Sequence, residues 1–375
     1  MSLKRGFIES IVRGAGCLGT SAAKQPENPS AIFVLRNNDI GDLLIITPLF
    51  EALKRLFPRA QIIAGIGSWN QDVLRNNPWV DRVLQINAPW HNKQICKYPH
   101  NSPRGFVKSL NYILTSDEGR QLKSLHCDIG IDILGSPEGS LLMIRAGIPW
   151  RLGVNGYAGG YSACQQNIMF DENIQVGRAA LRFAECLGAA NLPESRPQLF
   201  LAESEKEQAV KAWNGLGRQN AAPLKRILIA PGGGFVEKCW PREDYQKLVA
   251  ELARRSNTRI AIVGGQSDYE LGEFVKGASA QVTNLCGKTS LRETFALVWA
   301  ADGIICNGSM ILHTAAAFDK PTVVVLGKAF DSAQKHKRLW GYGAKDLHLG
   351  IEPGRTRMFT AEEAVPIINS HFGLC

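Results

Sequence analysis

Ile227-Leu-Ile-Ala-Pro-Gly-Gly-Gly-Phe-Val-Glu-Lys-Cys-Trp-Pro241 is the stretch of the chain that decides the fold. It opens with an apolar run that predicts a buried strand, and Pro231 and the glycines after it end that strand. A single cation, Lys238, then precedes the start of a new helix near Pro241. Glycines let backbone N–H groups approach an anion, and a helix N-terminus and an ammonium add positive potential. The stretch therefore suits a phosphate site and, equally well, an ordinary strand-to-helix turn.

Strands and helices alternate on both sides of this stretch. In the first half we expect strands at 31–36, 61–66, 82–86 and 128–134. In the second half we expect strands at 226–230, 259–263, 282–286, 303–306 and 321–326, with helices at 242–255, 267–277, 290–300 and 310–318. This order predicts an α/β protein with two Rossmann-like domains, whose mostly parallel sheets are covered on both faces.

In such sheets ligands bind beyond the carboxyl ends of the strands. The loops 37–42, 231–238, 264–268 and 307–310 are therefore expected around one central cleft.

The expected domains are separated by changes in composition. Residues 1–30 form an N-terminal arm, in which Phe7, Ile8, Ile11 and Val12 lie on one face of a short helix. This helix is either a packing arm, a frayed end or a weak membrane-surface helix. The other predicted segments are an N-terminal domain (31–190), a linker (188–197), a C-terminal domain (195–350) and a C-terminal helix (358–375).

Three local features complete the expected layout. Pro48 lies inside helix-forming sequence, so that the regular helix either begins at Thr47 or kinks there. The loop 87–103 is longer than a compact connection needs, so it is functional or mobile. The glycine-rich region 151–162 is predicted to be a loop.

Composition limits the class of protein. The 375 residues carry a net charge of +9 and are 45% hydrophobic, which fits a globular protein with an anionic ligand, an anionic membrane surface or nucleic acid. Basic residues are not interleaved with aromatic ones on a single element, which disfavours nucleic acid. No apolar run is long enough to cross a bilayer.

The nine cysteines include no Cys-x-x-Cys pair, and the histidines lack the spacing of metal ligands. We therefore expect reduced, buried thiols in a cytoplasmic protein, with no metal site and no disulfide framework.

Asp42 is the first residue that could carry chemistry. It follows Gly41 beyond the first strand, where a carboxylate could face the cleft, although spacing alone favours a helix-capping role. Gly287, Lys288 and Thr289 imitate part of a P-loop, but that motif needs a glycine where Val282 stands, so the P-loop interpretation fails.

The stretch from Asn307 to His313 joins a strand to a helix. Its small polar residues, Gly308 and Ser309, could hold an anion at the helix N-terminus. His313 lies one turn further on and is either part of that site or a satisfied core histidine. The basic cluster 335–338 is predicted to be a solvated surface.

In their order and spacing, these pieces resemble the bacterial ADP-heptose:lipopolysaccharide heptosyltransferases, glycosyltransferase family nine, over residues 31–372. The matching pieces are Phe33-Val-Leu-Arg36, Gly41-Asp42, Thr47-Pro48, Pro231-Gly232, Lys238-Cys-Trp-Pro241, Val263-Gly264-Gly265, Asn284-Leu-Cys-Gly-Lys-Thr-Ser-Leu291, Asn307 through His313-Thr-Ala-Ala-Ala317, and Phe359-Thr-Ala-Glu-Glu363.

The resemblance implies a GT-B fold and a metal-independent, inverting transfer of a sugar from a nucleotide-linked donor, with no further cofactor. It implies ADP-heptose as the donor, bound by the C-terminal domain (195–350). It also implies a lipopolysaccharide-core or related glycan as the acceptor, on the side of the N-terminal domain (31–190) and at the cytoplasmic face of the inner membrane. Asp42 falls on the family's catalytic base and Lys238 on the lysine that contacts the donor phosphates. The other substrate-binding residues proposed on this basis are Arg36, Gly41, Gly232, Gly233, Gly234, Gly265, Gly287, Lys288, Thr289, Asn307, Gly308, Ser309 and His313.

One motif departs from the family pattern. The family reads Asn-Asp-(Ser/Thr)-Gly-x-x-His where this chain has Gly308 in place of the aspartate and Met310 in place of the glycine. This departure leaves the identity of the sugar open. It also keeps two alternatives in view: a non-catalytic protein that binds a nucleotide sugar or a partner protein, and a nucleotide-sugar epimerase of the same fold.

Overall fold

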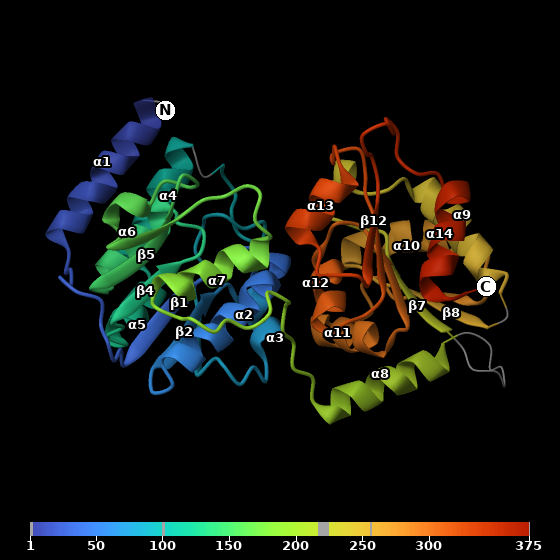
Figure 1. The fold of residues 1–375 in the computed structure, drawn as a ribbon, viewed down its shortest axis with the longest axis horizontal. Coiled ribbons are helices and arrows are strands. Elements are labelled where there is room, and N and C mark those ends of the chain that lie inside the picture. Colours follow the sequence, from blue (N-terminus) through green and yellow to red (C-terminus); the bar gives the residue numbers. More distant parts are fainter. Residues whose placement is uncertain (1–2, 100–101, 217–224, 256, 375) are drawn as a thin grey trace. The chain divides into compact units, whose positions relative to one another are not determined.

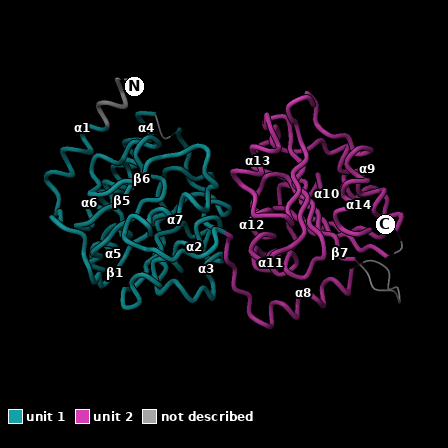
Figure 2. The backbone as a smooth tube through the Cα atoms, viewed as in Figure 1, with its two compact units in different colours: residues 1–195 teal, residues 196–375 magenta. Residues whose placement is uncertain are grey.

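The computed structural model describes residues 3–99, 102–216, 225–255 and 257–374, with the side chains of residues 3–8 left out. The chain divides into two compact units, residues 1–195 (unit 1) and residues 196–375 (unit 2), which Figure 2 distinguishes by colour. Each unit has its own sheet and its own hydrophobic core.

Unit 1 is built on a six-stranded sheet in the order β3-β2-β1-β4-β5-β6, in which every neighbouring pair is parallel (Figure 1). Its strands are β1 (Ala31–Leu35), β2 (Gln61–Ile66), β3 (Arg82–Gln85), β4 (Ile129–Asp132), β5 (Trp150–Asn155) and β6 (Gln166–Met169). Its helices are α1 (Leu3–Leu18), α2 (Ile40–Leu56), η1 (Ser68–Asn70), α3 (Gln71–Leu74), α4 (Pro103–Thr115), α5 (Asp117–Ser124), α6 (Pro137–Arg145), η2 (Tyr161–Ala163) and α7 (Val176–Cys186).

Unit 2 repeats this architecture with the parallel order β12-β11-β10-β7-β8-β9. Its strands are β7 (Lys225–Ala230), β8 (Thr258–Ile262), β9 (Val282–Asn284), β10 (Gly303–Cys306), β11 (Thr322–Val325) and β12 (Asp346–Leu349). Its helices are α8 (Glu203–Gly215), η3 (Val236–Lys238), α9 (Arg242–Ala253), η4 (Gln266–Asp268), α10 (Tyr269–Lys276), α11 (Leu291–Ala300), α12 (Met310–Ala317), α13 (Ala333–Trp340) and α14 (Ala361–Phe372).

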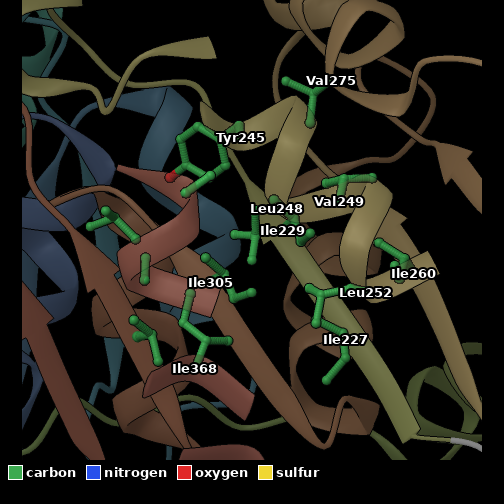
Figure 3. Close-up of a cluster of buried hydrophobic side chains, with 14 of the residues drawn as sticks. Ile227, Ile229, Tyr245, Leu248, Val249, Leu252, Ile260, Val275, Ile305 and Ile368 are labelled. Carbon is green, nitrogen blue, oxygen red and sulfur yellow. The ribbon is translucent and has the colours of Figure 1, made fainter. Parts of the chain in front are cut away.

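Strand β7 shows why these apolar runs form central strands. Ile227 and Ile229 pack into the cluster beneath α9 and α14 that Figure 3 shows, while Leu228 and Ala230 belong to a second cluster, with residues of α11 and α12. Successive side chains of a strand point to opposite faces, so a strand that is buried on both faces must be apolar throughout. Full burial of each isoleucine contributes about 1.5–3 kcal/mol, and the α/β, parallel-sheet prediction is confirmed.

Helix α2 contains Pro48 without restarting there. The helix begins at Ile40, so the predicted start at Thr47 is wrong. Pro48 has no N–H to donate to the carbonyl of Leu44, but the Thr47 hydroxyl donates to that oxygen at 2.7 Å. The side chain therefore satisfies the carbonyl that the proline leaves unpaired.

The glycine-rich region 151–162 is only partly a loop, which corrects the prediction. Residues 150–155 form strand β5, and β6 follows at Gln166. A Cβ on Gly153 would lie 2.9 Å from the Cys164 sulfur, so a glycine within this strand allows close packing. Gly156 and Gly159 have positive φ and make the turn.

The basic cluster 335–338 is not simply a solvated surface. It belongs to α13, and His336 is only 6% exposed because it packs beside His348 of β12. Strand β12 itself was not predicted, since its four residues, Asp-Leu-His-Leu, include two that are uncommon in buried strands.

Helix α1 packs against α6 and η2 of unit 1. Of its expected apolar face, Val12 is fully buried and Ile11 is 38% exposed, whereas the side chains of Phe7 and Ile8 lie outside the described residues.

Candidate active site

Each sheet has a topological switch point, where the chain leaves adjacent strands in opposite directions. In unit 1 it lies between β1 and β4, and in unit 2 between β7 and β10. Ligands of doubly wound sheets bind at such points, beyond the carboxyl ends of the strands. A ligand site in either unit is therefore expected at the residues that follow these four strands.

Asp42 lies in the first turn of α2, directly after β1. Its carboxylate accepts a hydrogen bond from the backbone N–H of Asp39 at 3.2 Å and pairs with the Arg36 guanidinium at 3.2 Å. Arg36 also donates from Nε to the Asp42 carbonyl and is only 8% exposed. The Asp42 side chain remains 35% exposed. One carboxylate can therefore both cap the helix, as its spacing suggested, and meet a substrate.

The loop after β3 is held against this position by two asparagines. The Asn37 side-chain amide donates to the Trp90 carbonyl at 3.3 Å, and that of Asn38 donates to the His91 carbonyl at 2.7 Å. Lys93 adds a backbone hydrogen bond and an ion pair to Asp39. The first part of the long loop 87–103 is thus tied to the start of α2.

A buried polar cluster at the end of β4 was missed by sequence reasoning. Asp132 accepts hydrogen bonds from the Ser136 N–H and hydroxyl, at 2.7 and 2.9 Å, and burial raises the pKa of its carboxyl. Nearby, His91 Nε2 lies 3.7 Å from the carboxylate of Glu138, which is 5% exposed. The sequence did contain a signal for this cluster, of the same kind as for Asp42. The carboxylate of Asp132 ends a strand, and a helix start at Ser136-Pro-Glu follows it.

In unit 2, Asn307 joins the two loops of the switch point. Its amide donates to the carbonyls of Pro231 and Gly232, at 2.7 and 3.2 Å. Its side-chain oxygen accepts from the Trp240 N–H at 2.9 Å and the Tyr245 hydroxyl at 3.0 Å. Asn307 is 1% exposed, and these four bonds use its amide fully. It therefore positions the 231–240 loop, and its role in substrate binding stays a prediction.

Lys238 ends the short helix η3 and is exposed. Its ammonium lies 5.1 Å from the centre of the Phe235 ring. Its backbone is fixed, since its carbonyl accepts from the Gly327 N–H at 3.1 Å. A Cβ on Gly327 would lie 2.4 Å from the Cys239 carbonyl, so only glycine allows this approach. Lys238 therefore has a fixed backbone and an exposed ammonium group that can contact an anion.

The loop after β10 presents Gly308 and Ser309 at the N-terminus of α12. The Ser309 Oγ is buried and has no hydrogen-bond partner among the described residues. A Cβ on Gly308 would lie 2.6 Å from Nε2 of His336, so this imidazole fills the space that a side chain at position 308 would take. His336 was not among the predicted site residues.

The remaining predicted residues of unit 2 have mostly internal roles. The Gly265 N–H donates to the Asp268 carboxylate at 2.9 Å, and a Cβ on Gly232 would lie 2.7 Å from that carboxyl group. Gly233 and Gly234 are exposed in the loop. His313 Nδ1 is paired with the Tyr342 hydroxyl at 2.8 Å, which makes it a satisfied core histidine.

The Gly-Lys-Thr sequence after β9 also serves the fold. Gly287 has φ of 70°, and a Cβ there would collide with the Gln266 side chain. Lys288 donates to the Asn284 carbonyl at 3.1 Å, and the Thr289 hydroxyl pairs with that of Thr294 at 3.0 Å. Ser290 caps α11, as expected. The structure does not bring these groups to Lys238.

The cysteines of the described residues are free, and three of them, at 127, 286 and 306, are buried. Cys17 is exposed, contrary to the expectation of buried thiols. Within the described ranges, no group of three or more histidine, cysteine or acidic side chains could hold a metal ion. Nor does any helix in that part of the chain have the length and hydrophobicity to cross a membrane.

Comparison with known families gives a match to the model of glycosyltransferase family 9 (heptosyltransferase) over residues 117–360. Lipopolysaccharide heptosyltransferase 2 of Salmonella typhimurium is 26% identical over 310 residues, which cover 79% of this chain and 82% of the relative. Lipooligosaccharide heptosyltransferase 2 of Haemophilus influenzae is 24% identical over 315 residues, covering 79% and 83%.

Solved structures with this fold include a glycosyl transferase family 9 protein from Veillonella parvula, with a TM-score of 0.75 at 18% identity. That similarity covers 93% of this chain and 99% of the other. The E. coli ADP-heptose lps heptosyltransferase II has a TM-score of 0.69 at 21% identity, covering 92% and 99%. At these identities the likeness establishes the fold.

The hydrogen bonds of Asn307 lead to a prediction about the stability of unit 2. Asn307→Ala should lower its free energy of unfolding by about 3 kcal/mol, because buried partners at Pro231, Trp240 and Tyr245 lose their hydrogen bonds. Hydrogen exchange measured by mass spectrometry should show faster exchange at the Trp240 amide. Asn214→Ala, at an exposed position of α8, is the control. Unchanged protection at Trp240 in Asn307→Ala would show that Asn307 does not hold the loop.

Proposed function

We propose that this chain, which belongs to glycosyltransferase family 9, the heptosyltransferases, transfers heptose from ADP-heptose to the core of a lipopolysaccharide. The family match over residues 117–360 carries the proposal. The relatives support the choice of acceptor, since they are lipopolysaccharide and lipooligosaccharide heptosyltransferases.

In the proposed reaction Asp42 is the general base. Its carboxylate takes the proton from the acceptor hydroxyl, and the resulting oxygen attacks the anomeric carbon of the donor sugar. The new glycosidic bond forms as the bond to the diphosphate breaks, on the opposite face of the sugar, so configuration inverts. The geometry supports this role because Arg36 and the Asp39 N–H orient the carboxylate, which stays partly exposed.

Lys238 and the N-terminus of α12 are proposed to stabilise the leaving diphosphate. Negative charge grows on the phosphate oxygens as the bond to the sugar breaks, and donors oriented in advance stabilise that charge. The Lys238 backbone is anchored by Gly327, and Ser309 offers a buried hydroxyl without a partner in the described structure. This arrangement requires no metal ion.

The two alternatives remain distinguishable by experiment. A non-catalytic member would bind the nucleotide sugar without consuming it, and an epimerase would convert it without an acceptor. An assay with donor, in the presence and absence of a lipopolysaccharide-core acceptor, separates all three.

We also propose that unit 1 contacts an anionic membrane surface through the α4 surface, defined as Arg104, Val107, Lys108, Leu110 and Leu114. Val107, Leu110 and Leu114 are 63%, 38% and 54% exposed and recur at helical spacing. Arg104 and Lys108 are exposed on the same helix. Apolar side chains flanked by cations suit the interface of a membrane with anionic lipids, such as the cytoplasmic face of the inner membrane, where the acceptor would be held.

Asp42→Asn tests the base. It should lower kcat by at least about 100-fold, because the amide cannot accept the proton, while the affinity for ADP stays within a factor of about two. Transfer is measured with ADP-heptose and a core acceptor, and ADP binding by calorimetry. Asp117→Asn, at an exposed position of α5, is the matched control. Near-normal turnover in Asp42→Asn would exclude this residue as the base.

Lys238→Ala tests the phosphate contact. The loss of a charge-assisted hydrogen bond should weaken ADP binding by about 10- to 100-fold, and Lys238→Arg should retain part of the affinity. Lys211→Ala, on the exposed side of α8, should bind as the unaltered protein does. Equal ADP affinity in Lys238→Ala and the unaltered protein would remove Lys238 from the site.

Membrane contact is tested by sedimentation with vesicles. Replacing both Val107 and Leu114 by Asp should reduce binding to vesicles containing phosphatidylglycerol by about tenfold or more. Met169→Asp is the control, because Met169 is similarly exposed, at 57%, on another element. Binding that is unaffected by the double change, or equal on vesicles of phosphatidylcholine alone, would contradict a role of the α4 surface.

A further inference from the structure

The space above Gly308 is shaped by one imidazole. A Cβ at this position would lie 2.6 Å from His336 Nε2 and 3.4 Å from Cζ of Phe330. The first distance is shorter than real Cβ contacts allow, so a larger residue would force the histidine to move. Gly308 and His336 therefore depend on each other.

His336 is held in one orientation. It lies in α13, is 6% exposed, and packs edge-on against Phe330 with ring centres 4.7 Å apart. Its Nδ1 lies 2.9 Å from Nδ1 of His348, so these two nitrogens share one hydrogen bond. The structure gives Nε2 no hydrogen-bond partner among the described residues, and this is the atom that borders the space over Gly308.

The neighbouring charges decide where the protons lie. His348 Nε2 is 3.5 Å from the Asp346 carboxylate, which favours a proton on that nitrogen. With the proton on Nε2, Nδ1 of His348 accepts a hydrogen bond from the Nδ1–H of His336. Nε2 of His336 consequently carries a lone pair.

His336 stays neutral under physiological conditions. Burial lowers the pKa of its imidazole to about 3, with His348, His313 and Lys238 acting in the same direction and Asp346 opposing them. It can therefore accept a hydrogen bond without carrying charge.

A second unpaired group belongs to the residue that follows Gly308. The Ser309 Oγ is buried without a partner in the described residues, at the N-terminus of the eight-residue helix α12. The Lys238 ammonium is near enough to act on His336 electrostatically. A lone-pair acceptor and a hydroxyl next to an ammonium suit a polyhydroxylated group joined to a phosphate.

We infer that His336 is a specificity-determining residue, whose Nε2, beside Gly308, accepts a hydrogen bond from a hydroxyl of the donor sugar. The inference rests on the proposed function, because it takes the sugar to be part of a nucleotide-linked donor. The neutral Nε2 of His336 occupies the place that the side chain of any residue other than glycine would take at position 308.

The test compares ADP with ADP-heptose in binding experiments. His336→Phe retains a ring of similar shape but removes Nε2, so it should weaken ADP-heptose binding about fivefold or more and change ADP binding less than twofold. His336→Gln, which offers a side-chain oxygen near the former Nε2, should recover part of the affinity for ADP-heptose. Lys335→Ala, an exposed neighbour on α13, is the control.

A paired substitution tests the dependence of the two positions. Gly308→Asp alone should abolish the tighter binding of ADP-heptose, because its Cβ displaces His336. Gly308→Asp combined with His336→Ala should restore part of it, since a carboxylate then supplies the acceptor. Additive effects of the two changes would overturn the inference.

The outcomes separate this inference from the proposed function. If His336→Phe weakens ADP and ADP-heptose equally, or weakens neither, His336 does not read the sugar, even though the unaltered protein transfers heptose. If the unaltered protein neither binds nor transfers heptose from ADP-heptose, the proposed function itself fails.

Discussion

The amide of Asn307 fixes the glycine-rich loop of unit 2 through four hydrogen bonds. A glycine-rich loop cannot fix its own path, because glycine restricts the backbone least. Here the residue that follows β10 binds both ends of the loop that follows β7, from Pro231 to Trp240. Strands β7 and β10 are hydrogen-bonded neighbours in the sheet. Their pairing fixes the position of the Asn307 amide, and the hydrogen bonds of that amide fix the path of the loop. The position of Lys238 follows from this chain of constraints.

Much of the fold could be predicted because parallel strands are apolar on both faces. The runs at 227–230 and 303–306 therefore stand out from the sequence, and both are strands. Strand β5 was missed because Gly153 weakens the pattern, although it permits close packing against Cys164. Strand β12 was missed because Asp346 and His348 are buried with partners that only the folded chain supplies.

The candidate site was less accessible to sequence reasoning. Asp42 and Lys238 could be proposed because each lies in a recognisable local motif, and the resemblance suggested their roles. His91 and Glu138 come from separate elements, as do Gly308 and His336, and nothing in their spacing brings them together. Conversely, Gly287 and Lys288 form a motif-like sequence whose groups the fold uses for its own turns. Sequence motifs predict which loops could bind a ligand. Tertiary contacts decide which side chains of those loops remain free of internal hydrogen bonds.

The carboxylate of Asp268 has a consequence for the donor. It accepts a hydrogen bond from the Gly265 N–H and lies close to Gly232, so the loop after β8 is already supplied with negative charge. A phosphate would be repelled there, because the Asp268 carboxylate already lies against Gly232. Along this edge of the sheet, an anion is attracted beside Lys238 and rejected one strand away. In the proposed reaction, this contrast in charge would set the register in which the diphosphate lies beside Lys238.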